Sequence, residues 1–446
     1  MVLYKLLSIT MIKLPRGTRD YDGEDYERLQ VLTKLAVNTF ETFQGEPLIT
    51  PMFERRDVLT SKYGEEEKLI FNLERGDEEN TEENTDVDPI DSLTEMEKEY
   101  TSLRYDMTVP FVRYVLSNNI VKMKRYTIGK VFRRETTNKK IKRLREFHQA
   151  DFDFVGVYDM NLPEIQIFKM INLFFAGLGV TNYTIKYNFR DLLYYYVTKA
   201  AEVSGDLFKQ VCISLDKLDK KPVEYVKDEM ATRGLTSSQV NIIFDCIAEA
   251  KFPLGENVDT VNSNLLEMID DYGITNIQFD PTLARGLDYY TGIIFEVTID
   301  GFGSSVGGGG RYDKLISQYN SEVDIPMIGF SLGLDRLLQY ANVIKQEKPT
   351  VIVFTIIQKT TDTERKQLNK VKAKVIDDVI SQNYVVDFMF NDKKARKQFS
   401  KFAADSNYKY AIIIGMDEIS QDSVAIKNLT TKEQTLVKMS DVRKFI

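Results

Sequence analysis

Residues 122–156 read KMKRYTIGKVFRRETTNKKIKRLREFHQADFDFVG, and the part at 122–147 predicts two β-strands joined by a basic loop at 136–142. In RYTIGKVFRRE, at 125–135, aromatic and β-branched residues are interleaved with charges, as is typical of strands. The second half, HQADFDF at 148–154, alternates polar with apolar residues, so its polar side chains face one side. The lysine-rich stretch at 136–142 lacks this pattern and is expected to be the loop.

The positive charge of the chain is concentrated on this hairpin. Residues 122–147 contain eleven lysines and arginines against two glutamates, a net charge of +9 in a chain whose net charge is −8. A solvated charged hairpin is one interpretation and contact with phosphates is the other; so large an imbalance favours phosphates. The overall negative charge excludes a uniformly basic nucleic-acid binder, so any nucleic acid must meet local patches.

Acidic residues occupy strand-like positions close to this hairpin. Asp106 lies in LRYDMTVP, and Asp151 and Asp153 lie two apart and therefore face the same side. Such carboxylates suit either a pocket for an ammonium or imidazole group or ion pairs with nearby arginines, and the spacing leaves both interpretations open. His148, the single histidine, is expected to be a packed residue rather than a catalyst, and a His-rich metal site is excluded.

Three arginines lie among apolar and glycine residues. Arg133, Arg285 and Arg336 occur in VFRRE, ARGLDYYTG and IGFSLGLDRL. Because a buried unpaired charge is costly, three such arginines suggest a polyanionic ligand held by guanidinium groups. The run GGGGRYDKL at 307–315 predicts either close approach to a ligand or, more simply, a tight turn; it fits neither a P-loop nor a dinucleotide fingerprint.

The order of patterns along the 446 residues indicates several domains. Apolar residues at helical spacing fill 185–275 and predict a helical insertion, whereas strands and glycine-rich turns return from 281. After about 349, strands alternate with helices, which predicts a small α/β domain with a mostly parallel sheet. The segment 74–99 holds twelve acids against two basic residues and is expected to be a solvated loop.

The compartment is expected to be cytoplasmic. Cys212 and Cys246 cannot form a CxxC site and suit a reducing environment. We expect no membrane span, secretory signal or transit peptide, because no apolar run is long enough and the first residues lack the required flanks. Met11 is an alternative start.

A family resemblance covers nearly the whole chain. It rests on LPRGTRDY (14–21), FQGEPLITPMFERRDVL (43–59), the stretch 130–156, LARGLDYYTG (283–292) and IGFSLGLDRL (328–337). Together they resemble the histidyl-tRNA synthetases of the eukaryotic and archaeal kind, with the second, third and fifth segments similar to motifs 1, 2 and 3 of class II aminoacyl-tRNA synthetases.

The resemblance implies an α+β fold: an antiparallel-sheet catalytic domain with a helical insertion, followed by an α/β anticodon-binding domain. The implied divisions are 1–184 and 276–345 for the two parts of the catalytic core, 185–275 for the insertion and 346–446 for the last domain. In the last domain, RNA-contact candidates are Lys393, Lys394, Arg396, Lys397 and Lys401, although a solvated helix face is the simpler interpretation.

The resemblance also implies site residues. Arg285 and Arg133 would be catalytic, acting on the α-phosphate of ATP. The residues implied to bind histidine are Asp106, Thr108, Arg133, Gln149, Asp153, Arg285, Tyr289 and Tyr290. Those implied to bind ATP are Arg133, Glu135, Arg143, Phe147 and Arg336, and no residue is implied to bind a metal ion.

The implied activity is that of a homodimeric histidine–tRNA ligase, with histidine, ATP with Mg²⁺, and histidine tRNA as its ligands. The alternative is an inactive paralogue that acts as a regulator or tRNA sensor, but such paralogues usually lose some of these arginines. One departure from the family pattern is Lys142-Arg143-Leu144, where Gly-Arg-Tyr is common, and it puts the geometry of the loop in doubt.

Overall fold

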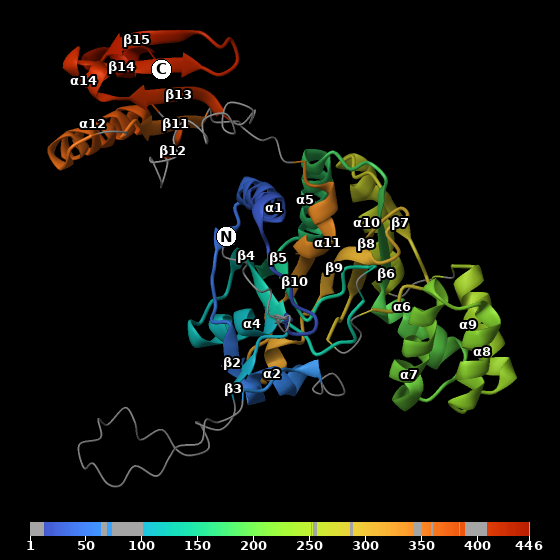
Figure 1. Cartoon of the computed structure of the whole chain (residues 1–446). Helices are drawn as coiled ribbons and strands as arrows, with labels where there is room; N and C mark the ends of the chain where they lie inside the picture. Colours follow the sequence, from blue (N-terminus) through green and yellow to red (C-terminus); the bar gives the residue numbers. More distant parts are fainter. Residues whose placement is uncertain are drawn as a thin grey trace, which may run out of the picture. The chain divides into compact units, whose positions relative to one another are not determined.

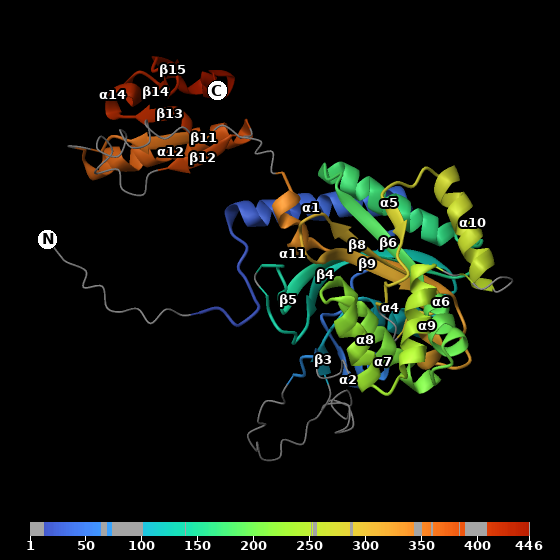
Figure 2. The same ribbon diagram turned by 90° about the vertical axis from the view of Figure 1, so that its right-hand side faces the viewer.

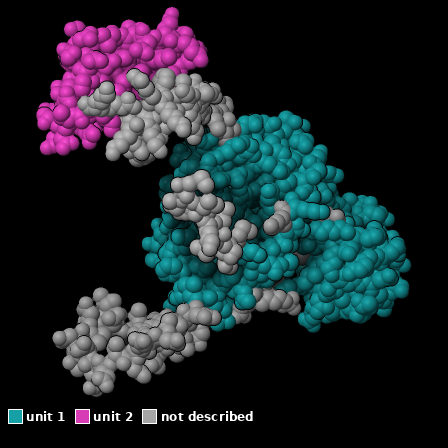
Figure 3. Space-filling model, viewed as in Figure 1, with its two compact units in different colours: residues 1–343 teal, residues 344–446 magenta. Residues whose placement is uncertain are grey.

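The computed structural model describes residues 13–63, 69–73, 101–138, 140–250, 252, 257–285, 289–342, 350–357, 360–382, 384–388 and 408–445. The chain divides into two compact units, residues 1–343 and 344–446 (Figure 3). The acidic segment 74–99, the basic candidates at 393–401 and the first twelve residues lie outside the described residues.

An eight-stranded sheet forms the centre of the first unit, in the order β1-β4-β5-β10-β9-β8-β6-β7 (Figure 1). The six inner strands are antiparallel, and the two edge strands pair in parallel. In sheet order the strands are β1 (Glu46–Pro47), β4 (Met123–Phe132), β5 (Glu146–Val155), β10 (Met327–Gly333), β9 (Ser305–Arg311), β8 (Ile293–Ile299), β6 (Tyr183–Phe189) and β7 (Ile277–Phe279). The two strands predicted on either side of the basic loop at 136–142 are thus confirmed as β4 and β5.

Two long helices cover one face of this sheet, α1 (Gly23–Thr42) and α5 (Leu162–Leu178) (Figure 2). The ring of Phe40 lies 5.4 Å from that of Phe152 and 5.8 Å from that of Phe330. Because side chains alternate along a strand, burial of Phe152 on this face turns Asp151 and Asp153 to the other. A one-residue slip of β5 would bury these acids in the apolar core, so the pattern fixes the register.

Smaller elements complete the border of the opposite face. They are β2 (Phe53–Arg55), α2 (Arg56–Tyr63), β3 (Thr101–Leu103) and α4 (Thr108–Ser117). Helix α11 (Leu334–Leu337) instead packs against α1 and β5.

The helical insertion differs from its predicted limits. Residues 185–189 continue strand β6, because YTIKYNF alternates, so the first insertion helix begins at Arg190. The lobe contains α6 (Arg190–Tyr194), a π-helix (Tyr195–Ala200), α7 (Gly205–Leu215), α8 (Val223–Thr232) and α9 (Ser237–Ala248). By contrast, α10 (Asn257–Asp271) packs against α5, and the Asn161 side chain donates to the Val261 carbonyl at 2.9 Å.

The second unit has a five-stranded sheet in the order β12-β11-β13-β14-β15. Its described elements are β11 (Thr350–Thr355), α12 (Asp362–Ser381), β12 (Val385–Phe388), β13 (Tyr408–Ile414), α14 (Met416–Ser420), β14 (Ser423–Asn428), β15 (Gln434–Lys438) and α15 (Val442–Phe445). The prediction of a mostly parallel sheet was wrong for half of the pairings, because the short connections after β13 make β14 and β15 antiparallel. No helix in the described part of the chain is both long and apolar enough to cross a membrane.

Candidate active site

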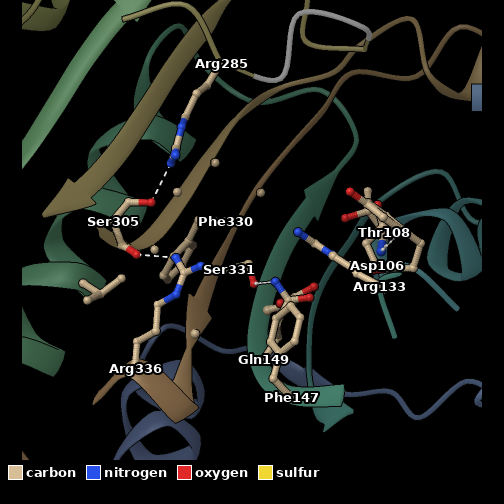
Figure 4. A pocket seen from close by; sticks show the side chains of 18 of the residues that line it. Asp106, Thr108, Arg133, Phe147, Gln149, Arg285, Ser305, Phe330, Ser331 and Arg336 are labelled. Atoms are coloured by element: carbon tan, nitrogen blue, oxygen red, sulfur yellow. Dashed lines mark hydrogen bonds between the residues drawn. The ribbon is translucent and has the colours of Figure 1, made fainter. Parts of the chain in front are cut away.

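A cavity of about 600 Å³ lies on the sheet face opposite α1 and α5. Strands β5, β9 and β10 form its floor, and the loop after β4, the start of α4 and helix α7 of the insertion contribute to its walls (Figure 4). All twelve residues implied by the family resemblance line this one cavity: Asp106, Thr108, Arg133, Glu135, Arg143, Phe147, Gln149, Asp153, Arg285, Tyr289, Tyr290 and Arg336. Residues 286–288, within the signature RGLDYYTG, lie outside the description.

Asp153 is held by two groups that sequence reasoning missed. Its carboxylate pairs with the Arg125 guanidinium at 2.7 Å, with side chains 3% and 1% exposed, and it accepts a hydrogen bond from the Tyr312 hydroxyl. Arg125 lies directly opposite Asp153 in the β4–β5 register. On the other side, a Cβ at Gly329 would lie 2.1 Å from Asp153 Oδ1, so glycine there makes room for the acid. A fixed carboxylate therefore lies at the floor.

The other acids are positioned differently. Asp106 Oδ1 accepts from the backbone N–H groups of Thr108 and Val109 at 3.1 and 3.0 Å, which ties it to the start of α4. Asp151 is buried beside Asp153 and Ser331, and burial, only partly offset by the Arg125 charge, raises its pKa to about 7. Asp153 thus both lines the cavity and forms an ion pair with an arginine, so for this acid the two positions considered from the sequence occur together.

The two tyrosines of the signature close the same end of the cavity. The rings of Tyr289 and Tyr290 lie 4.3 Å apart, and Tyr290 lies 6.5 Å from the ring of Tyr312. Burial raises the pKa of both hydroxyls, so both stay neutral. A Cβ at Gly310 would lie 2.7 Å from the Tyr290 ring. The predicted tight turn at 307–310 was wrong: these glycines lie within β9 because neighbouring groups crowd the strand.

Arginines form the opposite wall. The Arg133 guanidinium lies 4.4 Å above the Tyr105 ring and 5.4 Å from that of Phe147, and its Nε donates to the Tyr105 carbonyl. Glu135 lies between Arg133 and Arg143, at 3.8 and 3.6 Å, too far for direct hydrogen bonds. The backbone of Lys142, in the loop that departs from the family pattern, has φ of +51°, the left-handed conformation that favours glycine.

Arg285 and Arg336 meet at Ser305. Arg285 Nη1 contacts the Ser305 hydroxyl at 2.5 Å and the Glu296 carboxylate at 2.7 Å, and Arg336 Nη1 donates to the Ser305 carbonyl at 2.5 Å (Figure 4). Glu296 is 4% exposed and was missed. The signal was available, because Glu296 interrupts the apolar strand IIFEVTI as Asp151 and Asp153 interrupt theirs.

The electrostatics of this wall suit an anion. The pKa of Arg336 is lowered to about 10, first by burial and then by the charges of Arg143, Arg285 and Arg133. The charges of three neighbouring guanidinium groups thus act against that of Arg336, while Glu135 offsets this effect in part and Glu296 pairs with Arg285. A polyphosphate would relieve this repulsion.

His148 has a packing role, as expected. Its backbone N–H donates to Asp335 Oδ2 at 2.6 Å, and its ring packs edge-on against Tyr21 at 5.2 Å. The Tyr21 hydroxyl donates to the same Asp335. This cluster joins the N-terminal segment to β5 and α11.

No group of three or more His, Cys, Asp or Glu side chains that could hold a metal ion occurs among the described residues.

Two family models match the chain. The model described as histidyl-tRNA synthetase matches residues 17–337, and that described as anticodon binding domain matches residues 350–446. A crystal structure of histidyl-tRNA synthetase from Nostoc sp. PCC 7120 has the same fold, with a TM-score of 0.67, 22% identity, and coverage of 98% of this chain and 99% of that one.

Curated relatives agree with these matches. The cytoplasmic histidine–tRNA ligase of Dictyostelium discoideum is 30% identical over 96% of this chain and 89% of the relative. That of Arabidopsis thaliana is 32% identical over 94% of this chain, but the match spans 47% of the plant protein, about half its length. These matches show that the chain, whose two-unit fold agrees with them, belongs to the histidyl-tRNA synthetase family.

Proposed function

We propose that the chain is a histidine–tRNA ligase, which activates histidine with ATP to histidyl-adenylate and transfers the histidyl group to the 3′ end of histidine tRNA. The observation that supports this best is the division of one cavity into an acidic, tyrosine-lined end and a wall of four arginines. An amino acid with a basic side chain fits the first end, and a polyphosphate fits the second.

Activation requires a carboxylate of histidine to attack the α-phosphate of ATP while pyrophosphate leaves. Two anions must meet as negative charge builds, so fixed guanidinium groups lower the barrier by electrostatics and positioning. In this proposal Arg133 and Arg285 hold the α-phosphate and the substrate carboxylate, Arg336 holds the γ-phosphate, and Arg143 is a further ATP contact. Phe147 stacks on the adenine and Glu135 accepts from its amino group.

Selection of histidine is proposed to depend on the acidic end. Asp153 and Tyr290 pair with the ring nitrogens, with Tyr289 beside them, and Asp106, Thr108 and Gln149 hold the α-ammonium group. An analogue that lacks these N–H groups would leave buried polar atoms unpaired, which discriminates strongly.

Glu296 is proposed to position Arg285. Arg285 and Arg336 repel each other, and the buried Glu296 carboxylate, 2.7 Å from Arg285 Nη1, offsets this repulsion. A carboxylate held within a strand would keep Arg285 at the wall in the absence of ATP, so that less reorganisation is needed during the reaction.

Magnesium is proposed to enter with the nucleotide. Mg²⁺ is commonly bound by phosphate oxygens, water and one or two carboxylates, so a cavity with few acids at its cationic wall suits MgATP. Glu135, Asp216 and Asp335 are the carboxylates that line this part of the cavity, and the ion would neutralise phosphate charge.

The remaining proposals concern partners. The second unit, matched by the anticodon-binding model, would bind histidine tRNA. Ile49, Met52 and Phe53, in the segment similar to motif 1, are 86%, 53% and 59% exposed, and an exposed apolar group of this kind suits a homodimer interface. A cytoplasmic location is proposed because both cysteines are free, as suits a reducing compartment, and because the two relatives named above are cytoplasmic.

Aminoacylation tests the whole proposal. The purified chain should attach radiolabelled histidine to histidine tRNA in the presence of ATP and magnesium, and should leave a non-cognate tRNA uncharged. Folded protein that binds histidine but charges no tRNA would instead favour the regulator or sensor.

A further inference from the structure

The inference concerns a carboxyl group to which the proposed function gives no role. Asp151 is 3% exposed and lines the cavity floor between Gln149 and Asp153, on the same face of β5. Its Oδ1 is buried and, in the part of the chain that the structure describes, has no hydrogen-bond partner. A buried acceptor without a donor is costly, so this atom calls for a donor from outside the protein.

A second acceptor beside it has the same property. Gln149 Nε2 donates to the Ser331 hydroxyl at 2.6 Å, which leaves Oε1 buried and, among the described residues, without a partner. Gln149 and Asp151 lie on the same strand face, about 6.6–6.8 Å apart along the chain. Two acceptors that converge on one cavity suit a ligand group with several N–H donors and a positive charge.

Asp153 does not compete for that role. Its ion pair with Arg125 and its hydrogen bond from Tyr312 fix it at the deeper, tyrosine-lined end. Asp151, by contrast, has a side-chain hydrogen bond with Ser331. The charged and titratable groups that face Asp151 are Arg125 on β4, Asp153 on β5, Arg104 and Asp106 before α4, and Tyr290 at the same end of the cavity.

We propose that Asp151 is a further substrate-binding residue, which accepts from the α-ammonium group of the amino-acid substrate, with Oδ1 and Gln149 Oε1 as paired acceptors. The proposal rests on the proposed function, since histidine is the substrate. It also implies that the carboxyl group is largely protonated when the site is empty below neutral pH, and ionises when the ammonium group arrives. Histidine binding should therefore release a proton from Asp151.

Calorimetry of histidine binding, in two buffers with different ionisation enthalpies, measures both affinity and proton release. The variants are Asp151→Asn, which keeps an acceptor oxygen but removes the charge, and the matched control Asp378→Asn, a buried aspartate of the second unit. Asp151→Asn should weaken histidine binding about tenfold or more, as expected for a lost charge-assisted hydrogen bond. With a pKa of about 7, the wild type should release about half a proton more than this variant at pH 7, and the difference should vanish by pH 9.

A second pair of ligands locates the contact. Histamine keeps the ammonium and ring of histidine, whereas imidazolepropionate keeps the ring and lacks the ammonium. Asp151→Asn should weaken histamine binding by the same factor as histidine binding and leave imidazolepropionate binding unchanged. Equal weakening of all three ligands, or unchanged histidine affinity and proton release, would overturn the role of Asp151. Failure of the wild-type protein to bind histidine at all would instead refute the proposed function.

Discussion

The two ends of the cavity are built by different means. At the acidic end, Arg125 and Asp153 are almost fully buried and hold each other within hydrogen-bond distance. At the cationic wall, the side chains of Arg133, Arg143 and Arg285 are 24%, 36% and 38% exposed, and like charges face one another. The Arg125–Asp153 pair is formed before a ligand arrives, and a floor held rigidly in this way suits selection of a small molecule. At the more exposed cationic wall, the positive charge of the arginines exceeds the negative charge of the nearby carboxylates. This wall therefore suits a large, hydrated polyanion.

The largest expected effect is at the cationic wall. Arg285→Ala should reduce the rate of adenylate formation by at least about 10²–10³-fold, because a donor aimed at the developing charge is lost. ATP binding should remain partly intact, since three other arginines line the wall. Single-turnover formation of histidyl-adenylate measures the first quantity, and nucleotide titration the second.

The matched control is Arg443→Ala, which removes an exposed arginine paired with buried Asp378 in the other unit. It should leave adenylation unchanged. Full adenylation activity of Arg285→Ala would remove Arg285 from the mechanism.

The next effect is at the acidic end and combines binding with stability. Asp153→Ala should raise the KM for histidine strongly and lower the free energy of unfolding by about 3–5 kcal/mol, because Arg125 is left buried and unpaired. Adding Arg125→Met should restore much of the stability without restoring histidine binding. An unchanged KM for histidine in Asp153→Ala would contradict the assigned role, whatever its stability.

A smaller effect tests how the wall is held. Glu296→Gln should lower kcat for adenylation about tenfold, as expected for loss of a charge-assisted contact to Arg285, with the KM for histidine unchanged. Steady-state kinetics at varied histidine and ATP separate the two constants. Glu164→Gln is the matched control, because this buried glutamate pairs with Arg311. Equal losses in both variants would mean that Glu296 acts through the fold alone.

The smallest effect is that of salt. Raising the KCl concentration should increase the KM for ATP several-fold and change the dissociation constant of histidine little, because screening acts on exposed charges and spares buried pairs. Titrations of both ligands at low and high salt provide the measurement. Equal sensitivity of the two ligands would mean that the two ends do not differ in this way.

The strands of the first unit were predictable where one face is apolar and the other polar, as in residues 148–154. The start of the helical insertion was harder to predict, because the aromatic-rich sequence of Tyr183–Phe189 is similar to that of the helix that follows it. The antiparallel direction of β14 and β15 was not predicted, because the direction of a strand depends on the geometry of its connections rather than on its own sequence pattern.

That the residues implied by the family resemblance lie around one cavity could be expected from the sequence, but their pairings could not. Arg125 looks like any other cation of a basic hairpin, and only the register of β4 against β5 places it opposite Asp153. Likewise, Glu296 and Arg285 are separated by residues that give no hint of contact. The glycines of β9 were misinterpreted because crowding by Tyr290 and by the neighbouring strand is a tertiary effect.

The most direct test of this account is histidine-dependent exchange of radiolabelled pyrophosphate into ATP, with the purified chain and magnesium. If the acidic end selects histidine and the cationic wall holds ATP, exchange should require histidine and should not occur with other amino acids. Exchange that does not depend on histidine, or no exchange above background from folded protein, would contradict the account.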